Sequence, residues 1–190
     1  VSRVSQPSVA AIVNANQIMN LVIIVLSMAS TAVTVILSQY LGAQDEKNAS
    51  RTCMVSIVLI SGVSLAATIL VFAGHTPLYR AIHVPEEVFD EASLYLLIVG
   101  AFILVQGLYL TFSAMIRAFA MVKEVMIISV IMNAMNIVGN AILINGWFGM
   151  PQLGAVGAAI STDISKLVGL ALMIGMFFKS RRVKIGMSYL

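Results

Sequence analysis

Five long apolar stretches, separated by short polar segments, constrain this chain more than any other feature of its sequence. Each is long enough to approach or exceed the about 20 residues that an α-helix needs to cross a bilayer. The 190 residues are 60% hydrophobic and only 10% charged, whereas soluble domains carry about 25% charged residues. A soluble fold could not cover such a chain with polar groups. The sequence therefore predicts an all-α, polytopic membrane protein.

The hydropathy pattern also places the expected spanning helices. Their approximate ranges are 12–37, 53–73, 92–116, 125–144 and 155–178. The connecting segments are short and rich in turn-forming and charged residues, and none resembles a soluble domain. We therefore expect residues 1–190 to form a single transmembrane unit, a bundle of five spanning helices.

Basic residues are distributed unevenly between the two sides of these spans. One side would carry Lys47, Arg51, Arg117, Lys123, Lys179, Arg181, Arg182 and Lys184. The other would carry only Arg3 and Arg80, and Lys166 lies within the fifth span. Because Lys and Arg concentrate in cytoplasmic loops, we expect a multi-pass protein of the cytoplasmic membrane with its N-terminus outside and its C-terminus inside. An external N-terminus without an export signal predicts a further helix upstream; the alternative is a short translocated tail.

A stripe of polar side chains follows one face of the fourth span. Ser129, Asn133, Asn136 and Asn140 recur at intervals of four, three and four residues, which places them on one side of a helix. Ser and Thr stripes on the other spans are typical of hydrogen bonds that hold membrane helices together. Three asparagines bring many more donors and acceptors, so we expect Asn133, Asn136 and Asn140 to line a polar cavity.

The fifth span contains the only charged residues expected well inside the membrane, Asp163 and Lys166. Three residues apart on a helix, they are close enough to pair, which would lower the free energy of burying both charges. Buried charges are either paired for structural reasons or mark a transport pathway. The sequence leaves both interpretations open.

No residue pattern indicates an enzyme, a resident cofactor or nucleic-acid binding. The chain has one cysteine, Cys53, and two histidines, His75 and His83, without the spacing of a metal site or a catalytic set. It also lacks a glycine-rich phosphate-binding loop. The excess of basic residues is explained by membrane topology.

Two segments resemble the multidrug and toxic compound extrusion (MATE) family. Residues 9–18 and 31–45, ending in Ser38-Gln39-Tyr40-Leu41-Gly42-Ala43-Gln44-Asp45, are similar to that family's second helix. Residues 136–140 and 148–162 are similar to its fifth helix, the following loop and the start of its sixth helix. The resemblance implies that the five spans are helices two to six of the N-terminal lobe.

The resemblance also implies a function and a site. Family members have two six-helix lobes around a central cavity and export amphipathic, often cationic compounds in exchange for Na⁺ or H⁺. Asn136, Asn140 and Thr162 would match the N-lobe cation site, with Asn140 where the family has an acidic residue and the helix-one carboxylate outside this chain. Asp163 is the candidate substitute, although an ideal helix points it about 100° away from Thr162.

The expected function is therefore cation-coupled multidrug efflux by alternating access. The expected partners are amphipathic cationic small molecules, the bilayer, and a first helix and second lobe of the same protein. The expected substrate- and cation-binding residues are Asn133, Asn136, Asn140, Thr162, Asp163 and Lys166. One alternative is a lipid-linked saccharide flippase of the same superfamily. Another is a membrane assembly or scaffold protein whose polar stripes only join helices.

Overall fold

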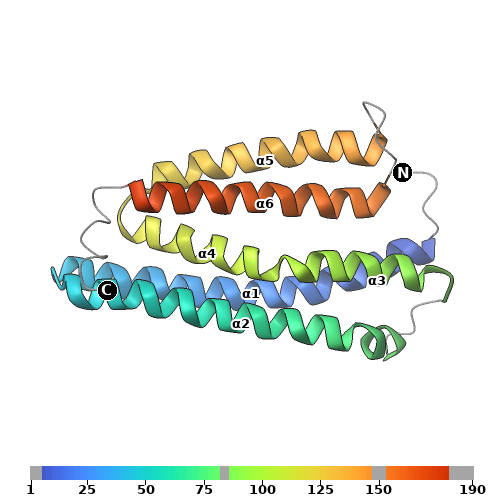
Figure 1. The fold of residues 1–190 in the computed structure, drawn as a ribbon, viewed down its shortest axis with the longest axis horizontal. Coiled ribbons are helices and arrows are strands. Elements are labelled where there is room, and N and C mark those ends of the chain that lie inside the picture. The colour runs from blue at the N-terminus through green and yellow to red at the C-terminus, as the bar shows by residue number, and fades with distance from the viewer. Residues whose placement is uncertain (1–5, 82–85, 147–152, 180–190) are drawn as a thin grey trace.

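The computed structural model describes residues 6–81, 86–146 and 153–179, and these residues form an all-helical bundle (Figure 1). Its helices are α1 (Gln6–Gly42), α2 (Glu46–Ala81), α3 (Glu86–Ala101), α4 (Ile103–Ala118), α5 (Val122–Asn145) and α6 (Gly154–Lys179). Four contain segments long and apolar enough to cross a membrane: Met19–Gly42, Glu46–Gly74, Val122–Ile144 and Val156–Lys179. The fold class predicted from the sequence, an all-α polytopic membrane protein, is confirmed.

The third expected span, residues 92–116, is two helices and not one. The helix is interrupted between α3 and α4 at Phe102, whose backbone N–H donates to the Val99 carbonyl at 3.3 Å. At this break the Thr68 hydroxyl of α2 donates to the Gly100 carbonyl at 3.2 Å. Helices bend where a side chain provides a partner for a backbone group, so the interruption depends on a contact with α2 that hydropathy does not reveal.

The helices are arranged around α4. Figure 1 shows α5 and α6 side by side along one edge of the bundle, α1 and α2 along the other, and α3 and α4 between them. Much of α4 is buried, and its Phe112 ring meets Phe177 of α6 edge to face with centroids 5.4 Å apart. Met115 and Met173 are fully buried in the same core. This central packing holds the α5–α6 hairpin against the other helices.

Large apolar side chains cover much of the outer surface of α1, α2 and α5. Met28, Leu70 and Ile137, one on each of these helices, are 69%, 71% and 69% exposed. Continuous apolar surfaces of this extent are rare on soluble monomers. They are expected where helices face lipid, because lipid tails provide the apolar surroundings that water does not.

Most of the basic residues in the described part of the chain gather at one end of the bundle, as predicted. The α1–α2 and α4–α5 turns and the C-terminal end of α6 all lie at that end (Figure 1). Basic residues near it are Lys47, Arg51, Arg117, Lys123 and Lys179. Arg3, Arg181, Arg182 and Lys184 of the same prediction lie outside the described residues. The assignment of this end to the cytoplasm stays a prediction.

Candidate functional site

A chain of hydrogen bonds joins α5 to α6 in the middle of the hairpin. The Asn136 side chain donates from Nδ2 to the Thr162 hydroxyl at 2.9 Å. The Asn140 side chain, one turn along α5, donates from Nδ2 to Asn136 Oδ1 at 3.1 Å. The Thr162 hydroxyl in turn donates to the Ala158 carbonyl at 2.8 Å. Three of the residues predicted from sequence thus form one polar network between two helices, with the Oδ1 atom of Asn140 buried and unpartnered.

Small residues allow α5 and α6 to approach closely beside this network. A Cβ atom added to Gly139 would collide with the Ser161 hydroxyl, and one added to Gly157 would lie 2.8 Å from the Leu143 carbonyl oxygen. The Ser161 hydroxyl donates to the Asn136 backbone carbonyl at 3.2 Å. Small residues at membrane helix contacts bring backbones together in this way. The network residues are therefore held by tight backbone packing.

The network adjoins a polar pocket between α1, α3 and α6. The pocket has a volume of about 160 Å³ and contains Thr162, the α6 member of the network. Its lining residues are Met19, Asn20, Ile23, Val99, Ala158, Ala159, Thr162, Asp163 and Lys166. Thr162 therefore connects the asparagines of α5 with both charged residues of α6. Asn20 of α1 lines the same pocket.

Asp163 is the most deeply buried charged side chain in the described residues. It is 2% exposed, and its Oδ2 atom has no hydrogen-bond partner. Lys166 lines the pocket beside it but does not provide a partner for this oxygen. The pairing expected from their spacing therefore does not satisfy this oxygen. An unsatisfied buried charge is costly and marks a site where a proton, ion or ligand can bind.

A second unsatisfied acceptor lies close to Asp163. The Oε1 atom of Gln106 on α4 is buried without a partner. Gln106 and Asp163 both line a small cavity of about 10 Å³, together with Lys166. A cavity of this size is near the lower limit for holding one water molecule. Each of these two acceptors lacks a donor, which a bound proton, a cation or a water molecule can provide.

The remaining candidate, Asn133, is not part of this constellation. Its side chain is exposed on the surface of α5 and forms no part of the hydrogen-bond chain or of the adjoining pocket described above. Other stripe residues form contacts between helices, as predicted for hydroxyl groups: the Tyr109 hydroxyl lies 3.2 Å from the Ser129 hydroxyl, and Thr34 donates to the Ala114 carbonyl at 3.3 Å. These hydroxyls join α4 to its neighbours.

The sequence missed the contribution of α4 to the charged part of the site. Gln106 was not among the predicted site residues, and nothing in the local sequence pattern places it at the cavity that Asp163 also lines. Ser161 and Gly139 were also missed, although small residues four apart, such as Gly157 and Ser161, are a recognisable signal of close helix packing. Within the described residues, no group of three His, Cys, Asp or Glu side chains is arranged to hold a metal ion.

Helices long and apolar enough to cross a membrane, with a polar network between two of them, are the features of a polytopic membrane protein. The MatE family model matches residues 1–142 of the chain. The chain belongs to the MatE family. Both parts of the sequence resemblance, the family and the helical membrane fold, are therefore confirmed.

Individual relatives support the same assignment. The chain is 37% identical over 187 residues to the uncharacterized transporter YisQ of Bacillus subtilis, covering 98% of this chain and 41% of that protein. It is 28% identical to the probable multidrug resistance protein NorM of Thermotoga maritima, covering 90% of this chain and 37% of that protein. A structure described as the inward-facing conformation of a multidrug resistance MATE transporter of the MOP superfamily matches with a TM-score of 0.82 at 22% identity, covering 94% of this chain and 40% of that one. The chain thus spans about 40% of the length of these relatives.

Proposed function

We propose that the protein containing this chain is a cation-coupled multidrug efflux antiporter that works by alternating access. The observation that carries the proposal is the continuity between the Asn136–Asn140–Thr162 network and the pocket that holds Asp163. Intramembrane polar and ionisable groups that face a cavity are characteristic of substrate and ion pathways. The family and the names of the NorM relatives support export of drug-like compounds.

In this proposal the Asn136–Asn140–Thr162 network and the pocket next to it form one polar site. This site binds the coupling cation, Na⁺ or H⁺, and the amphipathic cationic substrate in turn. Asn136, Asn140 and Thr162 offer neutral oxygen ligands, while Asp163 supplies the negative charge that those three residues lack. Lys166 competes with the bound cation for that charge. Asn133, exposed on α5, would face the central cavity once the rest of the protein surrounds it. Binding at the membrane midplane, with lobes rocking around the site, is the general pattern of such transporters.

The pocket also bears on the flippase alternative. Among the residues that the structure describes, Lys166 is the only basic side chain that lines it. A pyrophosphate-linked saccharide carries several negative charges, which one lysine beside a carboxylate does not neutralise. The geometry therefore favours a cationic over an anionic substrate.

The proposal is tested by transport measurements on the natural polypeptide that contains these residues, reconstituted in vesicles. Asn136→Ala combined with Asn140→Ala removes the network, and we expect exchange of a cationic dye against Na⁺ or H⁺ to be lost. Asp163→Asn keeps the size of the side chain and should abolish the dependence on the ion gradient. The matched control is Thr31→Val, because Thr31 is exposed and bonds only the Ser27 carbonyl of its own helix.

The outcomes distinguish an efflux antiporter from an assembly protein. Unchanged coupled exchange in folded Asn136→Ala, Asn140→Ala protein would rule out the proposed site. Loss of oligomers or of partner binding, with transport intact, would favour the assembly protein. Each variant is first checked for a monodisperse, folded state, because the network also joins α5 to α6.

A further inference from the structure

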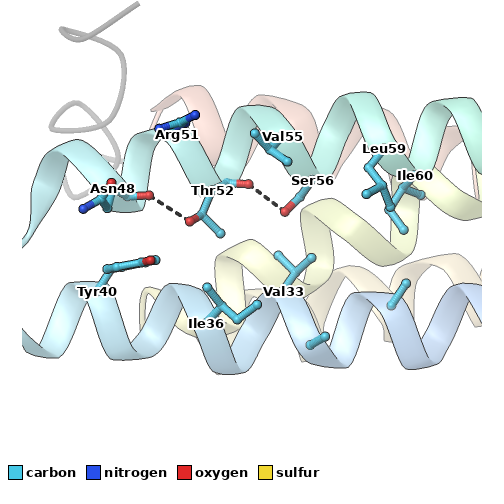
Figure 2. A pocket seen from close by; sticks show the side chains of 12 residues that line it. Val33, Ile36, Tyr40, Asn48, Arg51, Thr52, Val55, Ser56, Leu59 and Ile60 are labelled. Atoms are coloured by element: carbon cyan, nitrogen blue, oxygen red, sulfur yellow. Dashed lines mark hydrogen bonds between the residues drawn. The ribbon is translucent and has the colours of Figure 1, made fainter.

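A large groove lies away from the Asn136–Asn140–Thr162 network, on the outer face between α1 and α2. It has a volume of about 450 Å³ (Figure 2). Its residues are Ala29, Ala32, Val33, Ile36, Tyr40, Asn48, Arg51, Thr52, Val55, Ser56, Leu59 and Ile60. The volume is within the range of ligand-binding pockets, about 300–1,000 Å³. Neither the proposed transport site nor the predicted polar stripes account for it.

The groove has an apolar body. Ala29 and Ala32 on α1 leave space that larger side chains would fill, and Ile60 of α2 is buried in its floor. The two hydroxyl groups on its α2 wall are already satisfied. Thr52 donates to the Asn48 carbonyl at 2.8 Å and Ser56 to the Thr52 carbonyl at 2.6 Å, as the dashed lines in Figure 2 show. These hydroxyl groups therefore need no hydrogen-bond acceptor from a ligand in the body of the groove.

One end of the groove is polar and positively charged. Tyr40 and Asn48 face each other there across the two helices (Figure 2), and Arg51 lies on the α2 side. Residues 45–51 contain four charged side chains, Asp45, Glu46, Lys47 and Arg51, of which only Arg51 lines the groove. A ligand in the groove thus meets a single guanidinium, the side chain best suited to bind phosphate oxygens in pairs.

The length and position of the groove match one leaflet of a bilayer. From Ala29 to Tyr40 the α1 helix rises on the order of 16 Å, about half of the roughly 30 Å hydrocarbon core. The groove lies within the spanning segments Met19–Gly42 and Glu46–Gly74. Its charged end is the end of the bundle where the other basic residues gather, and such ends face the leaflet that is rich in anionic lipid.

We infer that the α1–α2 groove is a binding site for an anionic phospholipid, with one acyl chain between Ala32 and Leu59 and the phosphate at Arg51 and Tyr40. The apolar body of the groove binds the acyl chain of the lipid. The Arg51 guanidinium favours a negatively charged headgroup over a zwitterionic one. Basic pockets between membrane helices recognise lipid headgroups by this combination. The inference does not depend on which solute the protein transports.

Photocrosslinking tests the inferred lipid site in the natural polypeptide, reconstituted in vesicles of phosphatidylcholine and phosphatidylglycerol. Each lipid is supplied in turn as an analogue with a diazirine in one acyl chain, and labelled peptides are located by mass spectrometry. We expect phosphatidylglycerol to label the peptides containing Ile36 and Val55 more strongly than phosphatidylcholine does. Arg51→Gln should reduce this labelling about fivefold and reduce the phosphatidylcholine signal less, because that lipid carries the phosphate without a net negative charge. The matched control Lys47→Gln removes an exposed cation outside the groove and should change neither signal.

A second pair of variants tests the apolar body. Ala32→Trp fills the groove from an exposed position and should reduce labelling by both lipids, whereas Ala134→Trp, exposed on α5, should not. Equal labelling by the two lipids, or equal effects of Arg51→Gln and Lys47→Gln, would overturn the inference. So would the absence of label in the groove of folded protein, the result expected if another part of the polypeptide covers it.

Discussion

At the scale of single residues, Asp45 and Asn48 determine where the second spanning helix begins. The Asn48 backbone N–H donates to Asp45 Oδ1 at 3.0 Å, and its side-chain amide donates to Oδ2 at 2.6 Å. Asp45 immediately precedes α2, so its carboxylate caps a backbone donor of the first turn. The same two hydrogen bonds, the backbone bond foremost, hold the pKa of Asp45 below its ordinary value of 3.8.

This cap predicts a pH-dependent contribution to stability. Because the pKa of Asp45 is lower in the folded than in the unfolded chain, the stabilisation is fully present above pH 3.8 and is lost as the pH falls through the folded pKa. We expect Asp45→Ala to lower the apparent melting temperature at neutral pH and to have progressively less effect below pH 3.8. Thermal unfolding of the unchanged protein and of the Asp45→Ala variant, at several pH values on both sides of pH 3.8, measures this difference in melting temperature. A difference that stays constant with pH would mean that the carboxylate charge does not contribute.

At the scale of elements, the α5–α6 hairpin depends on glycine for its close contact. A Cβ atom on Gly157 would lie 2.8 Å from the Leu143 carbonyl oxygen and 3.0 Å from its carbonyl carbon. These are backbone atoms, which cannot move aside as a flexible side chain can. The contact keeps α5 near enough to α6 for Asn136 to reach Thr162.

We therefore predict opposite effects of two substitutions on the same helix. Gly157→Ala should separate α5 from α6 and destabilise the protein by about 1–3 kcal/mol. Gly175→Ala, where the added methyl group meets nothing within 4 Å, should be neutral or stabilising, because alanine favours helix over glycine. Apparent melting temperatures in detergent provide the comparison. Equal effects of the two changes would show that the close contact contributes little.

At the scale of the whole molecule, two features define the bundle: apolar side chains face outward on several helices, and most basic residues of the described ranges lie at one end. The first feature is a property of proteins in lipid. The second orients a protein across the membrane, because translocation of basic segments is disfavoured. Together they predict which end of the bundle faces the cytoplasm and which end faces the outside.

Cysteine labelling tests that orientation. In a Cys53→Ala background, Lys123→Cys lies in the α4–α5 turn region and Leu153→Cys lies at the opposite end, next to the start of α6. Both native side chains are exposed. A membrane-impermeant maleimide should label Leu153→Cys in intact cells and Lys123→Cys only after permeabilisation. The reverse pattern would place the basic end outside and contradict the proposed topology.

Hydropathy alone is enough to predict the class of fold and the positions of most helices. Apolar stretches of spanning length leave the chain no stable arrangement except helices in lipid, since only there can both its side chains and its backbone be satisfied. The stretches marked the hydrocarbon region and not the helix ends. Thus α1 and α2 extend well beyond the apolar residues 12–37 and 53–73, because a helix continues through polar residues at the membrane surface.

The tertiary structure decided what those helices do together. Periodicity placed Asn133, Asn136 and Asn140 on one side of α5, but only packing against α6 joined Asn136 and Asn140 to Thr162 and left Asn133 exposed. The break at Phe102, the cavity lined by both Gln106 and Asp163, and the α1–α2 groove are also products of packing. Hydropathy and helical period are local properties of the chain, whereas each of these features depends on which helix lies opposite.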